Sequence, residues 1–390
     1  MNFLQKLSPK NSILSMAICV ALLMVMPFAV GMIGTAWVRI IDYTLLYVML
    51  AMGLNLVVGF AGLLDLGYIA FYAVGAYMVG LLASPHLSEN FATIHAAFPE
   101  GLHAPLWVII PLGAALAACA GLILGMPILK LRGDYLALVT LGFGEIIRIF
   151  INNLGKNTVV KGDGWWEMIV AFIKGEDSFN FTNGPRGITR IDPVSIFGHK
   201  LSQPLDLGFV TLTKEAQYYY LFLILAAFTI FVCYRLQKSR LGRAWMALRE
   251  DDVAAKAMGI NVRNIKLLAF ALGATFGGVA GGMFASFQGF VSPESFTYLE
   301  SIIILSMVVL GGMGHIPGVV LGAILMSLFP EFLRYVVEPV QNALFGHNLI
   351  DTSVLRLLLL GLAMVLIMLY RPRGLWPTPT REDKKPVKTA

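Results

Sequence analysis

Ten apolar runs dominate this chain, and each is close to the length that a membrane-crossing helix requires. A bilayer-crossing helix needs roughly 20 mostly apolar residues, and such runs lie near residues 12–35, 40–59, 66–83, 106–129, 134–153, 217–234, 266–287, 299–311, 317–336 and 353–370. Only 13% of the 390 residues are charged and 57% are hydrophobic, whereas a soluble domain carries about 25% charged residues. We therefore predict an all-α, polytopic membrane protein: one transmembrane domain over 1–390, with about ten spans.

The distribution of Lys and Arg predicts how the spans are oriented. Residues 84–104 and 267–333 contain no Lys or Arg, whereas 235–265 and the tail 371–390 are rich in them. Ten spans with both termini in the cytoplasm place these basic segments inside, as the positive-inside rule requires. The segment 155–215 is then an extracytoplasmic insert. The net charge of +6 follows from these loops and does not indicate a nucleic-acid partner.

The basic loop 235–265 contains a short polar segment that is unlike a membrane span. Residues 247–258 (ALREDDVAAKAM) predict a helix that Gly259 ends. Acidic residues near its start suit the positive end of a helix dipole, and small alanines permit close packing against another surface. We interpret this helix as a docking surface; the alternative is a solvated amphipathic hairpin that only obeys the charge rule.

Two apolar runs are interrupted by glycines, at 59–67 (GFAGLLDLG) and at 311–318 (GGMGHIPG). Paired interruptions, one in each half, point to a substrate path in transporters; the alternative is two tight cytoplasmic turns between helices. The candidate path residues are Asn55, Gly59, Gly62, Asp65, Tyr68, Tyr72, Gly311 and Gly312. A third glycine group, at positions 273, 277, 278, 281 and 282, has the spacing of a small-residue face for close helix packing.

Ionisable residues within the apolar runs are the next candidates for function, because charges are costly in hydrocarbon. They are Asp65, Asp134, Glu145, Arg148, Glu300 and Arg356. Glu145 and Arg148 share a helix face and are expected to pair. Structural pairing is the favoured interpretation for all of them except Asp65, which lies in a glycine break with no cation near it in the sequence.

No catalytic motif is present. The sequence contains no phosphate-binding G-x-x-x-x-G-K-[ST] loop, no G-x-S-x-G elbow, no HExxH helix and no CxxC pair. The six histidines are scattered, and the three cysteines, Cys19, Cys119 and Cys233, all lie in apolar runs. We expect no catalytic residue, no metal site and no cofactor.

Six sequence segments together resemble one known family, the second permease type of the high-affinity branched-chain amino acid ABC importer. They are GLNLVVGFAGLLDLGYIAFYAVGAY (53–77), LRGDYLALVTLGFGEIIRI (131–149), TNGPRGI (182–188), GRAWMALREDDVAAKAMGINVRNIKLLAF (242–270), VSPESFTYLESIIILSMVVLGGMG (291–314) and RPRGLWP (371–377). The order and spacing of these segments are more specific than any one of them. The resemblance covers nearly the whole chain after the first run.

The resemblance implies a non-catalytic membrane subunit with the ABC importer permease fold, placed in a bacterial inner membrane. Its implied partners are a companion permease, two cytoplasmic ATPase subunits, a periplasmic amino-acid-binding protein and the lipid bilayer. The loop would carry an ATPase-coupling helix centred on Glu250, Asp251, Asp252, Ala254, Ala255 and Gly259.

Two departures from the family pattern, His315 with Pro317 and the divergent insert, leave the substrate open. Related permeases carry urea, short amides or other amino acids. Outside the family, an ion-coupled secondary transporter and a membrane-embedded enzyme are the rival interpretations. The first would need a paired intramembrane ionisable site, and the second would need a catalytic set on one face.

Overall fold

The computed structural model describes residues 9–128, 131, 133–156, 179–196, 198–206 and 211–345, together with scattered positions between 354 and 376. The predicted run 353–370 therefore lies mostly outside the described residues, as do Arg132, Arg356 and most of the tail. The side chain of Asp134 is also outside them.

Within the described residues, seven helices are long and apolar enough to cross a membrane. Two shorter apolar helices, Val20–Gly31 and Ile69–Leu82, accompany them. The prediction of a polytopic, mostly helical membrane protein is confirmed, while the count of about ten spans stays a prediction.

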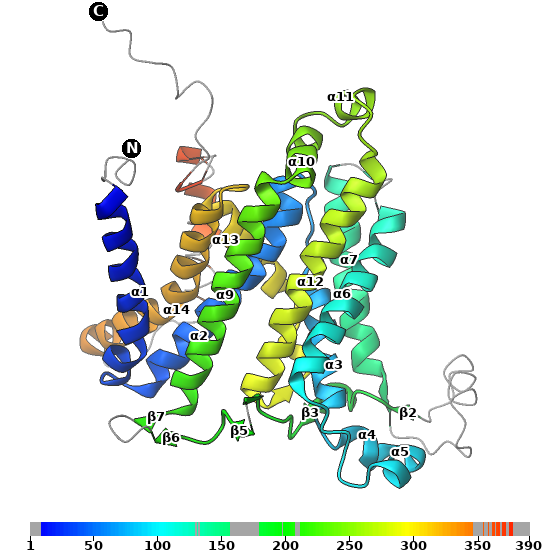
Figure 1. The fold of residues 1–390 in the computed structure, drawn as a ribbon, viewed down its shortest axis with the longest axis vertical. Helices are drawn as coiled ribbons and strands as arrows, with labels where there is room; N and C mark the ends of the chain where they lie inside the picture. Colours follow the sequence, from blue (N-terminus) through cyan, green and yellow to red (C-terminus); the bar gives the residue numbers. More distant parts are fainter. Residues whose placement is uncertain are drawn as a thin grey trace, which may run out of the picture.

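The helices, in chain order, are α1 (Pro9–Gly31), α2 (Thr35–Asn55) with a π-helical turn (Leu56–Phe60), α3 (Ile69–Leu82), α4 (His86–Asn90), α5 (Ala92–Ala97), α6 (Leu106–Ile128), α7 (Asp134–Asn153), α9 (Lys214–Lys238), α10 (Arg240–Glu250), α11 (Asp252–Ala257), α12 (Val262–Gln288), α13 (Tyr298–Gly311) and α14 (Ile316–Phe345). The long helices lie side by side, and α10 and α11 project from one end of the bundle (Figure 1). Helices α4 and α5 and the strands gather at the other end.

Short strands at that other end make the class mostly helical rather than all-α. Four antiparallel two-stranded ladders pair β1 (Gly155–Lys156) with β2 (Phe179–Asn180), β3 (Ile188–Thr189) with β8 (Phe290–Val291), β4 (Ser195–Ile196) with β5 (His199–Lys200), and β6 (Leu205–Asp206) with β7 (Thr211–Leu212). The β3–β8 ladder joins the insert to the segment that follows α12.

Helix α12 packs against α2, α3 and α6, and its glycines make this close packing possible. A Cβ atom at Gly278 would lie 2.7 Å from the Ala117 side chain on α6, and one at Gly281 would collide with the Tyr72 carbonyl oxygen on α3. Backbones that approach this closely require small residues. The predicted small-residue face is confirmed.

The two glycine breaks have different structures. After the π-helical turn, the chain runs without helix from 61 to 68 and packs against α7, where the Leu66 N–H donates to Thr140 Oγ1 at 3.0 Å. The second break is a four-residue turn, 312–315, between α13 and α14.

The single helix predicted over 247–258 is wrong in one respect: the chain forms two helices that meet at Asp251. This residue has an extended backbone, and its side chain caps α11, with Oδ1 accepting from Val253 N at 2.7 Å and Ala254 N at 3.1 Å. Because Asp favours N-cap positions, it ends one helix and begins the next. Gly259 has a φ of +84°, which suits a residue that follows a helix.

Candidate functional site: a junction between the polar helical loop and the glycine breaks

Helix α10 is fixed to the bundle along one face. Ser239 caps it by accepting a hydrogen bond from Gly242 N at 3.2 Å, and the fully buried Trp245 donates its indole N–H to the Ile265 carbonyl at 2.8 Å. Leu248 is also buried. The cap fixes the start of α10, and the indole hydrogen bond fixes its middle to α12.

Arg249, one turn after Trp245, reaches from α10 into the first glycine break. Its Nη1 donates to the Gly59 carbonyl oxygen at 2.6 Å. Its side chain also lies against Gly62, where a Cβ would come within 2.9 Å of Arg249 Cγ. Gly62 has a φ of +69°, a conformation that glycine adopts at little cost.

The same point is where the two glycine breaks meet. Asn55 Oδ1 accepts a hydrogen bond from Gly314 N at 2.8 Å, and a Cβ at Gly314 would lie 2.8 Å from Arg249 Nη1 and 3.0 Å from Gly59 O. We call Asn55, Gly59, Gly62, Arg249 and Gly314 the glycine junction. It joins the end of α2, the turn between α13 and α14, and the last turn of α10.

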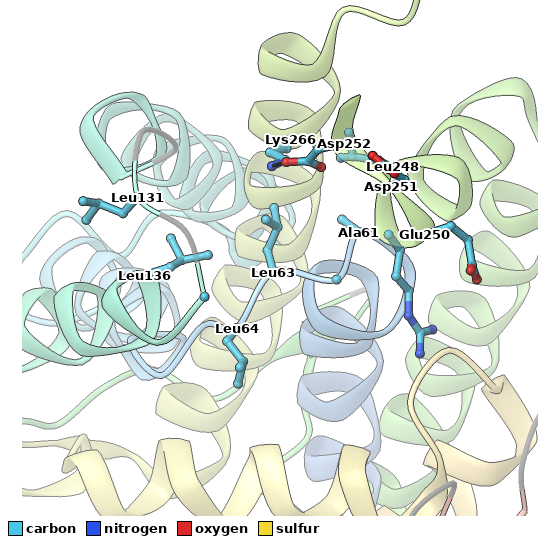
Figure 2. Close-up of a pocket in the computed structure, with 13 residues that line it drawn as sticks. Ala61, Leu63, Leu64, Leu131, Leu136, Leu248, Glu250, Asp251, Asp252 and Lys266 are labelled. Atoms are coloured by element: carbon cyan, nitrogen blue, oxygen red, sulfur yellow. Dashed lines mark hydrogen bonds and ion pairs between the residues drawn. The ribbon is translucent and has the colours of Figure 1, made fainter. Parts of the chain in front are cut away.

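Helix α11 adds an ion pair and an exposed apolar surface to this end of the molecule. Asp252 Oδ2 lies 2.6 Å from Nζ of Lys266, whose side chain is only 10% exposed, so the start of α11 is tied to α12. Figure 2 shows this pair above Leu63, while Glu250 points away from the leucines. The residues line a pocket with 61–64 and the start of α7.

Part of the outer surface of α11 and of the residue that follows it is apolar and uncovered, next to the exposed Lys256. Val253 is 70% exposed and Met258 is 83% exposed, and Ala254 is exposed as well. Ala255, by contrast, faces inward and is buried. An apolar tip on a helix anchored by an ion pair has the character of a contact surface.

The other predicted path residues lie apart from the junction. Asp65 is buried, and its Oδ1 accepts a hydrogen bond from Gly67 N at 2.9 Å, so it stabilises the non-helical segment 61–68. Tyr68 is fully buried between α2 and α12, where its hydroxyl donates to the Gly273 carbonyl at 3.1 Å. Tyr72 lines a separate aromatic pocket between α2, α3, α12 and α13.

The second break is held from the C-terminal side. Gly311 packs against Gly318, and the N–H groups of Leu375 and Trp376 donate to the carbonyls of Leu310 and Gly311 at 2.9 and 3.3 Å. Gly312, with a φ of +114°, lies against Gly374. Neither Gly311 nor Gly312 touches Arg249 in the described contacts.

The predicted pairing of Glu145 with Arg148 is confirmed, with Arg148 Nε donating to Glu145 Oε1 at 2.9 Å. Arg148 Nη1 also lies 3.5 Å from Glu294. Glu300 instead accepts from the Tyr47 hydroxyl at 3.0 Å. In the described ranges no group of His, Cys, Asp and Glu side chains is suited to hold a metal ion.

Arg249 is the residue whose role the sequence did not reveal. In the sequence it is one of several basic residues in a loop, and its charge is explained by the positive-inside rule. Only the fold brings residues 59, 249 and 314 together. The glycines around 59 and 314 indicated in the sequence that the helices are interrupted there. No sequence pattern indicated that Arg249 is the residue that contacts them.

These features define a class: a multi-pass helical membrane protein with glycine-broken helices and a polar helical loop fixed to them at one end. Residues 36–368 match the family described as branched-chain amino acid transport system / permease component. The chain belongs to this family.

Individual relatives agree with the family match. The chain is 39% identical, over 89% of its length and 71% of the relative's, to the high-affinity branched-chain amino acid transport system permease protein LivM of Escherichia coli (strain K12). It is 23% identical, over 85% of its length and 90% of the relative's, to a probable LivM permease of Methanocaldococcus jannaschii. A shorter match, 33% identical over 41% of the chain and 46% of the relative, is to the permease BraD of Pseudomonas aeruginosa. No solved structure matches the chain significantly.

Proposed function

We infer that this chain is a transmembrane permease subunit of an ATP-driven importer of branched-chain amino acids. Family membership supports the class and the substrate. The observation that carries the mechanism is the hydrogen bond from Arg249 to Gly59, because it connects the polar helical loop to the glycine breaks in the membrane domain.

The loop acts as a mechanical link in this proposal. Helix α10 is anchored to α12 through Trp245, and α11 is anchored through the Asp252–Lys266 ion pair. A push on the exposed tip, Val253 and Met258, therefore displaces α10, α11 and α12 together. Arg249 passes the displacement to Gly59 and Gly314, at the ends of α2 and α13. Ligand-driven motions of this kind use rigid helices and a few hinge residues.

The partners follow from the same interpretation. Two cytoplasmic ATPase subunits would bind the α10–α11 end, a companion permease would complete the path, and a periplasmic binding protein would deliver the amino acid at the opposite end. The molecule would then lie in a bacterial inner membrane with both termini in the cytoplasm. The α10–α11 end carries most of the Lys and Arg of the loop 235–265, which agrees with the positive-inside rule.

Purification and reconstitution test this function. The full complex, purified from its native membrane and placed in vesicles, should contain an ATPase and accumulate leucine only when ATP is supplied on the loop side. Accumulation of leucine by this chain alone under an ion gradient would contradict the proposal and favour a secondary transporter. Uptake of urea or short amides in preference to leucine, valine and isoleucine would contradict the proposed substrate. The proposed ATP-driven mechanism would still hold.

A further inference from the structure

The aromatic pocket that contains Tyr72 has a composition that the proposed coupling mechanism does not explain. Its walls are side chains of α2, α3, α12 and α13, including Tyr43, Tyr47, Phe284 and Ile304. Aromatic rings pack around it, with the Tyr72 ring 5.4 Å from both Phe284 and Phe296. Such a wall accepts an aliphatic side chain.

One carboxylate, that of Glu300, lies in this otherwise uncharged pocket. Glu300 Oε2 accepts a hydrogen bond from the Tyr47 hydroxyl at 3.0 Å. Within the part of the chain that the structure describes, no Lys, Arg or His nitrogen lies within 4.0 Å of it. Glu145, by comparison, has an arginine as its partner. A carboxylate in apolar surroundings is stabilised by a cation, and none is supplied by the neighbouring described side chains.

We propose that this pocket is a resting site for the transported amino acid, in which Glu300 binds the ammonium group and the aromatic wall holds the branched side chain. Ammonium over tyrosine rings gains cation–π attraction in addition to the ion pair. The hydroxyls of Tyr72 and Ser295, which line the same pocket, are the groups available to the substrate carboxylate. The inference rests on the proposed function, since it assigns the site within the membrane for the same substrate.

The pocket is placed where a substrate would be controlled by the glycine junction. Leu50 lines the pocket, and Asn55 of the junction is five residues further along α2, a separation of about 7.5 Å along a helix axis. Tyr72 is also packed against Gly281 of α12. A shift of α2 or α12 at the junction therefore changes the shape of the pocket, which would release the bound amino acid.

The first test compares two glutamates of the same region in the reconstituted full transporter. Glu300→Gln should lower the rate of leucine uptake at least about tenfold, because an ion pair is replaced by a neutral contact. Glu294→Gln is the matched control, since Glu294 is exposed and does not line the pocket; its uptake should equal that of the wild type. Basal ATP hydrolysis should be unchanged in both variants, which shows that the complexes are assembled.

A second test does not depend on the activity of a glutamate variant. In a transporter whose natural cysteines are replaced, Ser295→Cys should react with methanethiosulfonate ethylammonium, and leucine should slow the reaction. Tyr298→Cys is the control, because residue 298 is exposed and outside the pocket, so leucine should not affect its labelling.

The outcomes separate the site from the function. If the wild-type transporter fails to import leucine, the proposed function is wrong. If the wild type imports leucine but Glu300→Gln is as fast, or leucine protects positions 295 and 298 equally, the pocket is not the substrate site.

Discussion

At the scale of single residues, the contact between the polar loop and the glycine breaks is made by one guanidinium group, that of Arg249, which lies between glycines. The last carbonyls of a helix lack partners within the helix, and Arg249 binds one of them, Gly59 O. Arginine suits this position because it offers several donors in a rigid plane and keeps its charge. The small glycines leave the space that its side chain occupies.

Removing this guanidinium should separate ATP hydrolysis from transport. We expect Arg249→Ala to leave ATP hydrolysis near the wild-type rate while leucine uptake falls about tenfold or more, because a hydrogen bond from a charged, partly buried group contributes roughly 1.5–3 kcal/mol. The measurement is the number of leucine molecules imported per ATP hydrolysed in vesicles. Arg243→Ala, on an exposed arginine of α10 that bonds only the Lys238 carbonyl in the described contacts, is the control. An unchanged ratio in Arg249→Ala would remove Arg249 from the coupling route.

Gly59 tests how tightly the junction is packed. A Cβ at this position would collide with Asn55 Oδ1 and lie 2.6 Å from Gly314 N, so Gly59→Ala should lower stability by about 1–3 kcal/mol, the usual cost of overpacking. Gly142→Ala in α7 is the control: nothing lies within 4 Å of its Cβ position, and alanine should stabilise the helix by up to about 1 kcal/mol. Thermal unfolding of the purified proteins measures both changes. If Gly59→Ala had the same unfolding midpoint as the wild type, the glycine junction would accommodate a Cβ without strain.

At the scale of elements, α11 is a short helix that depends on its cap. Hydrogen bonds from the backbone N–H groups of Ala254 and Val253 hold the pKa of the Asp251 carboxyl below its ordinary value. A carboxyl whose pKa is lower in the folded state stabilises that state above its unfolded pKa, and the stabilisation is lost as the pH falls through the folded value. The structure of α11 should therefore loosen in acid.

Hydrogen exchange over 252–257 measures this effect. After correction for the intrinsic rate, exchange at the amides of Val253 and Ala254 should accelerate as the pH is lowered through the pKa of the Asp251 carboxyl. Asp251→Asn should keep the cap and abolish the pH effect, because asparagine caps about as well without ionising. Asp251→Ala should exchange fast at every pH. Glu250→Ala, at the end of α10, should behave like the wild type; a pH effect that persists in Asp251→Asn would contradict this account.

The elements also show where prediction from sequence succeeds. The periodic glycines of α12 predicted a packing face, because spacing alone brings them to one side of a helix. The boundary between α10 and α11 was missed, because an aspartate within a helical pattern does not reveal whether its side chain faces solvent or caps the next turn. The conformation of segment 61–68 was left open between a substrate path and a tight turn, since it depends on contacts with Thr140 in α7, far away in the sequence.

At the scale of the whole molecule, hydropathy and charge predicted the class because they depend on composition rather than on contacts. The glycine junction could not be predicted in the same way. It joins residues 55–62, 249 and 314, and their meeting is a property of how α2, α10, α13 and α14 pack. The same holds for Glu300, for which a structural pairing was expected: it accepts a hydrogen bond from Tyr47 and also lines an aromatic pocket, and the pocket depends on how the helices pack.

In the proposed mechanism the α10–α11 end receives mechanical work from a cytoplasmic ATPase, and a cysteine at position 258 tests this contact. Met258 is 83% exposed at the tip, so Met258→Cys, with Cys19, Cys119 and Cys233 replaced, should tolerate the change. In the assembled transporter we expect this cysteine to cross-link to an ATPase subunit and to escape a membrane-impermeant thiol reagent added outside intact cells. Labelling from outside, or no cross-link in a transporter that imports leucine, would contradict the account.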